Sequence, residues 1–164
     1  MTIQRPSSSS LDESLAAAWL THGVRPHRRA TFSGLAESRT FAAGDVVMRD
    51  GEPSDFLGVL LSGRLALRLR VPERGPVTIL TVEPGDVVGW SALVPPYRAT
   101  STVVALADSE VANFEGTRLR AALADDDSLA AEFYPLILDA VARRLEGTRL
   151  QLLDLFSQRW VEPW

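Results

Sequence analysis

The sequence contains no cysteine. This absence excludes disulfide bonds, thiolate nucleophiles, iron–sulfur clusters and zinc sites that use cysteine ligands. Histidine is scarce as well, because His22 and His27 are the only two in the chain. They lie near the N-terminus, five positions apart, and that spacing is a poor one for two metal ligands on a helix. We therefore expect no bound metal.

The chain also lacks a surplus of positive charge. It has 17 Lys and Arg residues against 21 Asp and Glu residues, which gives a formal net charge of −4. Proteins that bind nucleic acid neutralise phosphates with an excess of Lys and Arg. The basic stretch from Arg25 to Arg29 is short, and a solvated connector explains it better than a nucleic-acid contact. We expect no DNA binding by this chain alone.

Long apolar runs are missing too. No uncharged apolar segment approaches the roughly 20 residues that cross a bilayer, and the N-terminal run from Leu15 to Leu20 is too short for a secretory signal. With 46% apolar and 23% charged residues among 164, the composition suits one globular domain with a sizeable core. These features predict a cytoplasmic protein without a membrane contact.

The sequence also lacks a complete catalytic motif among those we looked for. Gly89 to Leu93 partly matches the G-x-S-x-G nucleophile elbow, but Leu93 replaces the final glycine and no histidine follows Ser91. In hydrolases with this motif, the histidine that acts as the base follows the serine in the chain. The chain has no G-x-x-x-x-G-K-[ST] and no G-x-G-x-x-G phosphate loop. We do not expect an enzyme.

From residue 39 onward the chain is patterned as short strands. Arg64 to Val71 alternates, with four apolar residues on one face, which is typical of a half-buried strand. Turn signals recur about every ten residues, the spacing of β-sandwiches and barrels. They are Ala43-Gly44-Asp45, Asp50-Gly51-Glu52-Pro53, Ser62-Gly63, Arg74-Gly75-Pro76 and Pro84-Gly85-Asp86. We expect antiparallel strands from about Thr40 to Phe114.

Helices are predicted on both sides of this strand region. The expected helices run from Ser10 or Asp12 to Leu20, from Thr31 to Glu37, from Thr117 to Ala124, and from an acidic cap at Asp125 to Asp127 with Ser128 onward. Pro135 should bend or restart the last of these. After it, Leu136 to Phe156 is a continuous helical pattern with one glycine, Gly147. The plan is helix, barrel and long helix.

The long helix carries an apolar heptad pattern. Its positions are Leu138, Leu145 and Leu152 in one row, and Val141, Thr148 and Leu155 in the other. Such a stripe is either a dimer seam, which we favour, or the face that packs on its own domain. The other apolar residues can serve the barrel side, namely Leu136, Ile137, Ala140 and Leu153.

The segment GWSALVPPYR, residues 89 to 98, can recognise phosphate without a classical loop. Gly89 permits a tight turn, Ser91 offers a hydroxyl and a helix-start amide, and Arg98 offers a bidentate cation. The competing interpretation is that Trp90 and its apolar neighbours are barrel core, with Arg98 at the rim.

The order of turns and elements resembles the cyclic nucleotide-binding domain of the cAMP receptor protein and FNR family. The resemblance rests on three segments, Phe41 to Val47, Asp50 to Leu65 and Val82 to Gly89, and covers roughly Leu35 to Phe156. It implies a mainly β fold, a jelly-roll barrel, with flanking helices and a long dimerising C-terminal helix. The corresponding divisions are 1–34 for a tail and short helices, 35–127 for the barrel, and 128–164 for the long helix and tail.

The same resemblance implies a ligand, cAMP or cGMP, and the residues around it. The expected ligand-binding residues are Val88, Gly89, Trp90, Ser91, Ala92, Arg98, Ala99, Thr100, Thr148 and Arg149. The stretch Ala142 to Thr148 matches the family's dimer-helix sequence A-R-R-L-x-x-T, whose Thr reaches the bound purine. An unpartnered Thr148 hydroxyl would cost on the order of 1–3 kcal/mol, so a ligand or a backbone group should satisfy it.

This sequence departs from the family pattern in three places. Trp90 stands where the family has the Glu that takes the ribose 2′-hydroxyl, and the residues after Arg98 are Ala-Thr-Ser, so the small residue comes one place early. Both changes predict weak binding of cyclic AMP in the usual pose. Eight residues follow Phe156, too few for the family's helix-turn-helix, which predicts a stand-alone module.

Two functions remain open. In the first, a phosphate-bearing small molecule binds at Gly89 to Arg98 and shifts the long helix of a homodimeric sensor. In the second, Trp90 closes the pocket, and the barrel only dimerises or docks on another regulatory protein. We favour the first, because an arginine kept beside this turn chemistry is hard to explain in a closed pocket.

Overall fold

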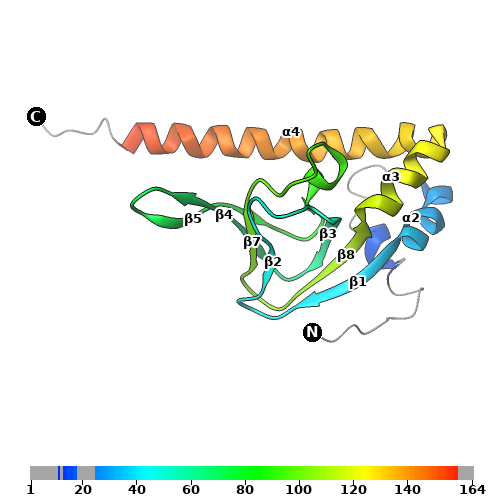
Figure 1. Ribbon diagram of the computed structural model, residues 1–164, viewed down its shortest axis with the longest axis horizontal. Helices are drawn as coiled ribbons and strands as arrows, with labels where there is room; N and C mark the ends of the chain where they lie inside the picture. The colour runs from blue at the N-terminus through cyan, green and yellow to red at the C-terminus, as the bar shows by residue number, and fades with distance from the viewer. Residues whose placement is uncertain (1–10, 12, 18–24, 159–164) are drawn as a thin grey trace, which may run out of the picture.

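The computed structural model describes residues 11, 13–17 and 25–158 (Figure 1). Residues 13–17 are helical, so the first expected helix is present in part, while its expected caps Ser10 and Asp12 and its expected end at Leu20 lie outside the described residues. A 3₁₀ turn, η1 (Pro26–Arg28), leads into α2 (Arg29–Leu35). The predicted range of Thr31 to Glu37 was wrong at its end, because Ala36 and Glu37 pair with a strand, Ala36 opposite Phe114.

Within the described residues, eight antiparallel strands form two four-stranded sheets. The bounds are β1 (Ala36–Phe41), β2 (Val46–Met48), β3 (Phe56–Ser62), β4 (Leu65–Val71), β5 (Gly75–Val82), β6 (Val87–Val88), β7 (Thr102–Ala105) and β8 (Ser109–Glu115). One sheet has the order β1-β8-β3-β6 and the other β2-β7-β4-β5. The fold is the expected jelly-roll barrel followed by a long helix, although its first strand starts before the predicted Thr40.

The alternation in β4 is confirmed only in its first half. Leu65 and Leu67 are buried, whereas Leu69 is 36% exposed, because the β4–β5 hairpin extends away from the barrel (Figure 1). Ala66, on the opposite face from the leucines, is also fully buried. All five glycines of the predicted turns have positive φ values, namely Gly44, Gly51, Gly63, Gly75 and Gly85.

Two apolar clusters hold the fold together. One fills the barrel between the sheets and includes Leu60, Val82 and Val111. The other joins the first sheet to the helices and includes Phe114 and Phe133. The N-terminal residues Leu11 and Leu15 and Phe32 of α2 belong to this second cluster. Burial of this apolar surface therefore fixes the helices on one side of the barrel.

Two helices follow the barrel, and acidic side chains cap both. In α3 (Gly116–Asp125), the carboxylate of Glu115 accepts from the N–H groups of Thr117 and Arg118 at 3.0 and 2.6 Å. In α4 (Asp127–Gln158), Asp126 accepts from the N–H groups of Ser128 and Leu129 at 3.0 and 2.9 Å. The predicted acidic start is thus confirmed, and the capping residue is Asp126.

The long helix α4 runs along the barrel and past it (Figure 1). Pro135 lies inside α4, so the predicted restart at this residue was wrong. Proline removes one backbone donor, but buried Phe133 and Ile137 hold the helix against the core on either side of it. Tertiary packing thus outweighs the local cost of the proline.

The heptad rows of α4 face different surroundings. Leu138 and Leu145 are 70% and 51% exposed, whereas Val141 packs against the core beside the helices. Leu136 and Ile137 also pack there, but Leu153, which was expected on the barrel side, is 64% exposed. Leu138 and Leu145 are therefore available to another partner, whereas the side chains of Leu152 and Leu155 lie outside the described ones. Dimerisation stays a prediction.

Candidate ligand pocket

The chain turns sharply where β6 ends. Gly89 has a φ of +70°, and a Cβ atom built on it would lie 2.3 Å from the carbonyl oxygen of Phe56. Only glycine fits here, since any side chain would collide with β3 and would also strain the backbone. This turn opens a short 3₁₀ helix, η2 (Trp90–Leu93). The predicted tight turn at Gly89 is confirmed.

One buried and one partly buried hydrogen bond hold η2 against its neighbours. The Ser91 hydroxyl donates to the Ser54 hydroxyl at 3.0 Å in a buried contact. At the other end of η2, the guanidinium of Arg120 donates to the Ala92 carbonyl at 2.5 Å and stacks on Tyr97, 4.3 Å from the ring centroid. Helix α3, which carries Arg120, is thereby linked to η2.

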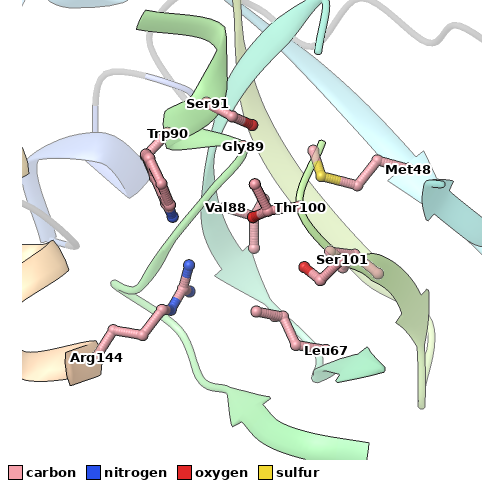
Figure 2. A pocket seen from close by; sticks show the side chains of 10 residues that line it. Met48, Leu67, Val88, Gly89, Trp90, Ser91, Thr100, Ser101 and Arg144 are labelled. Carbon is pink, nitrogen blue, oxygen red and sulfur yellow. The ribbon is translucent and has the colours of Figure 1, made fainter. Parts of the chain in front are cut away.

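A pocket lies beside this turn (Figure 2). It is a small, partly open hollow with a cavity volume of about 10 Å³, and its lining consists of Met48, Leu67, Val88, Gly89, Trp90, Ser91, Thr100, Ser101, Val103 and Arg144. Apolar side chains form its floor, and the hydroxyl-bearing Thr100 and Ser101 come from the segment before β7. Polar and apolar atoms contribute to the lining about equally, and a hollow of this size has room for roughly one water molecule.

Half of the predicted site residues line this pocket. They are Val88, Gly89, Trp90, Ser91 and Thr100. Of the other five, Ala92 and Ala99 are buried but do not line the pocket, and Arg149 is exposed on α4. Thr148 also lies outside it, and its hydroxyl donates to the Arg144 carbonyl at 2.9 Å. A backbone group therefore satisfies the hydroxyl.

The Arg98 side chain points in another direction than the sequence predicted. We expected its guanidinium to point at the N–H groups of Trp90 and Ser91, but it donates to the Gly51 carbonyl at 2.6 Å. The reason is backbone pairing, since Arg98 forms a bridge with Pro53 and the adjacent Ala99 N–H donates to the Glu52 carbonyl at 2.9 Å. The loop containing Gly51 therefore holds this arginine outside the pocket lining. Its role in binding stays a prediction.

The cation that the structure places at the pocket is Arg144. It comes from α4, is half-buried, and its guanidinium is directed into the cavity opposite Trp90 (Figure 2). Burial lowers the pKa of Arg144 from its ordinary value, and the negative charge of Asp86 opposes that shift. We had not predicted this residue. The A-R-R-L stretch contained the signal, but the spacing alone does not say which arginine faces the barrel.

The structure is a jelly-roll barrel with a small hollow next to a short helix. The family model of the cyclic nucleotide-binding domain matches residues 38–126. The chain therefore belongs to the cyclic nucleotide-binding domain family. The match spans both sheets, the tight turn at Gly89 and η2.

Two of the curated relatives are named as a regulator and a regulatory subunit. The chain is 30% identical over 146 residues to the CRP-like cAMP-activated global transcriptional regulator of Mycobacterium tuberculosis, an alignment that covers 88% of this chain and 63% of the relative. It is 31% identical over 89 residues to the cAMP-dependent protein kinase regulatory subunit of Hypocrea atroviridis, covering 54% and 18%. The chain thus spans less than two thirds of either relative.

A solved structure supports the fold independently. The cyclic nucleotide-binding domain from Methylobacillus flagellatus aligns with a TM-score of 0.82 and 16% identity, covering 92% of this chain and 86% of that domain. Within the described residues, no three or more His, Cys, Asp and Glu side chains group in a way that could hold a metal ion. No helix in the described part of the chain is long and apolar enough to span a membrane.

Proposed function

We propose that the protein is a non-catalytic sensor module that binds a cyclic nucleotide, cAMP or cGMP, or another phosphate-bearing small molecule in the pocket beside η2. The observation that carries this proposal is the turn at Gly89, which aims the start of η2 at a cavity lined by Thr100, Ser101 and Arg144. Helix-start N–H groups and a cation together suit an anion. The names of both curated relatives mention cAMP.

The module acts as a homodimer through α4 in this proposal. Leu138 and Leu145 leave a large apolar area exposed on one face of the helix, and a second copy of the chain would cover it. A ligand that contacts the pocket wall formed by α4 would then change the position of the two copies relative to each other. Regulation of a downstream protein would follow from that change.

The second candidate is a ligand-free interaction module. Trp90 is half-buried, packs against the core beside the helices and also lines the pocket. An aromatic ring in that place narrows the cavity, and the barrel would then serve for dimerisation and docking alone. This alternative predicts that no cyclic nucleotide changes the stability of the protein.

A thermal-shift and calorimetric titration with cAMP, cGMP and adenosine tests the proposal. We expect the cyclic nucleotides to raise the melting temperature and adenosine to have a smaller effect, because only the former carry a phosphate. Thr100→Val removes a pocket hydroxyl and should weaken binding, whereas Thr78→Val, on the exposed part of β5, should not. No shift with either cyclic nucleotide at millimolar concentration would favour the interaction module.

A further inference from the structure

One arginine of α3 holds the end of η2 and the loop that follows it. The guanidinium of Arg120 donates from Nη1 to the Ala92 carbonyl oxygen at 2.5 Å and from Nη2 to the Thr117 hydroxyl at 3.2 Å. Its carbon Cζ lies 4.3 Å from the centroid of the Tyr97 ring. Arginine suits this place because its planar guanidinium can donate in its plane and stack on an aromatic face at the same time. Arg120 therefore joins α3, η2 and the residues after η2 at a single point.

The loop after η2 contains a strained residue that this arginine contacts. Tyr97 has a φ of +55°, in the left-handed region that residues other than glycine occupy only where their surroundings hold them. Its N–H donates to the Val94 carbonyl at 2.9 Å, and its own carbonyl accepts from the Ser54 N–H at 2.8 Å. The ring is 38% exposed and has the Arg120 guanidinium against it. Backbone and side-chain contacts together thus hold the loop in one conformation.

The start of α3 leaves room for the guanidinium. A Cβ atom on Gly116 would lie 3.1 Å from Nη1 of Arg120 and 3.4 Å from the Cβ atom of Ala92. The guanidinium therefore lies against the bare backbone of a buried glycine. Nearer the start of η2, the Ser91 hydroxyl donates to the Ser54 hydroxyl in a buried contact. These two anchors hold the short helix between the barrel and α3.

We propose that Arg120 is a positioning residue for the pocket. It does not line the pocket, and it acts on a ligand only through η2. By holding the Ala92 carbonyl it fixes the orientation of η2, and with it the N–H groups at the start of η2 and the side chain of Trp90, which lines the pocket (Figure 2). A hydrogen bond weakens steeply when its donor is misaligned, so an anchor outside the pocket controls the affinity inside it. This assignment rests on the proposed function of the pocket.

The test compares Arg120→Gln with the matched control Arg118→Gln. Both residues lie in α3, and both guanidinium groups donate to a backbone carbonyl, that of Arg118 to the Gly34 carbonyl at 2.9 Å. The control therefore removes the same charge and the same kind of bond at a place that does not touch η2. The probes are cAMP and cGMP, titrated by calorimetry, and thermal unfolding gives the stability of each protein.

We expect Arg120→Gln to weaken the binding of cAMP or cGMP roughly three- to tenfold, the value of one well-aligned hydrogen bond. Arg118→Gln should bind as wild type does, even where the two variants lose the same amount of stability. An equal loss of affinity in both variants would indicate a general structural effect and would overturn the assignment. Unchanged affinity in Arg120→Gln would overturn it as well and leave the proposed function standing.

A double-mutant cycle tests whether the ring of Tyr97 belongs to the same anchor. Tyr97→Leu removes the stacked ring, and Arg120→Gln is then added in that background. Because the two side chains hold one loop together, the second substitution should weaken binding much less than it does in wild type. Additive losses would overturn the shared anchor.

A ligand-free measurement separates this proposal from the proposed function. The indole N–H resonance of Trp90 in a ¹H–¹⁵N spectrum, assigned by its loss in Trp90→Phe, reports the orientation of η2. Hydrogen exchange of the Ala92 N–H, which donates to the Gly89 carbonyl at 2.9 Å, reports how often η2 opens. Arg120→Gln should shift the resonance and speed the exchange, and Arg118→Gln should do neither.

The two proposals can then fail separately. If Arg120→Gln changes both signals but wild type binds no cyclic nucleotide at millimolar concentration, the proposed function fails and the positioning of η2 by Arg120 stands. If neither signal changes in Arg120→Gln, the positioning role is wrong whatever the pocket binds.

Discussion

Gly89→Ala is the sharpest test of how the pocket is built. The backbone at this residue has a φ of +70°, and an added Cβ would lie 2.3 Å from the Phe56 carbonyl oxygen and 2.9 Å from the Met48 methyl group. The left-handed conformation costs an alanine about 1–2 kcal/mol. Relief of the collision with β3 adds about 1–3 kcal/mol, the usual cost of overpacking. We expect a total loss of roughly 2–5 kcal/mol in the free energy of unfolding.

Gly51→Ala is the matched control. Gly51 has a φ of +77°, but a Cβ there meets nothing within 4 Å, so only the conformational cost of about 1–2 kcal/mol applies. Urea unfolding of wild type and the two variants is followed by far-UV circular dichroism. When the slope of the free energy of unfolding against urea concentration is the same in all three proteins, the midpoints give the two differences in stability. Equal destabilisation by the two substitutions would refute the close approach of Gly89 to β3, and with it the geometry assigned to η2.

Four further predictions concern the ligand, the dimer and pH. Trp90→Glu should strengthen cyclic nucleotide binding by one to two decades, roughly the value of one charge-assisted hydrogen bond to the ribose, and calorimetry measures it. Arg98→Ala abolishes binding of an anionic ligand if its guanidinium leaves Gly51 for the pocket, and unchanged affinity would remove Arg98 from the site. Leu138→Glu with Leu145→Glu should give monomers by sedimentation at about ten micromolar, while monomeric wild type would refute the seam. Hydrogen bonds from Ser128 and Leu129, and then the charge of Arg28, lower the pKa of Asp126 from 3.8 to about 2. The ionised carboxylate therefore stabilises the fold above pH 3.8, and this stabilisation is lost as the pH falls through about 2. Asp126→Asn should make the free energy of unfolding less dependent on pH in that range.

The turns of the barrel could be predicted from sequence because each depends on a local property. A positive φ nearly requires glycine, and glycines at regular spacing therefore mark where strands end. The caps of α3 and α4 are equally local, since Glu115 and Asp126 contact N–H groups two or three residues away. For such features the sequence neighbourhood contains all the atoms that decide the outcome.

The direction of Arg98 could not be predicted in this way. The residues that decide it, Gly51 and Pro53, lie more than forty positions earlier in the chain. Its side chain follows a bridge between two segments, and no local pattern encodes that pairing. The same holds for the end of α2, where pairing of Ala36 with Phe114 ends the helix before Glu37. Pro135 shows the converse, because local propensity predicted a bend or a restart, and α4 continues through this residue where Phe133 and Ile137 pack on the core.

Trp90 and Arg144 have one physical explanation when they are considered together. The family resemblance puts a carboxylate at position 90, and Figure 2 shows that this position faces Arg144 across the pocket. A carboxylate about 4 Å from a guanidinium gains about 4 kcal/mol of attraction at an effective dielectric constant of 20, before desolvation is subtracted. Such a pair would neutralise Arg144 within the protein. With an indole at position 90, the guanidinium donates to the Val87 carbonyl, and the negative charge that acts on it within the described residues is that of Asp86. A glutamate introduced at position 90 then has two competing partners, the ribose hydroxyl and Arg144. Trp90→Glu should consequently strengthen cyclic nucleotide binding more in an Arg144→Gln background than in wild type, and equal gains in both backgrounds would show that the two side chains do not interact.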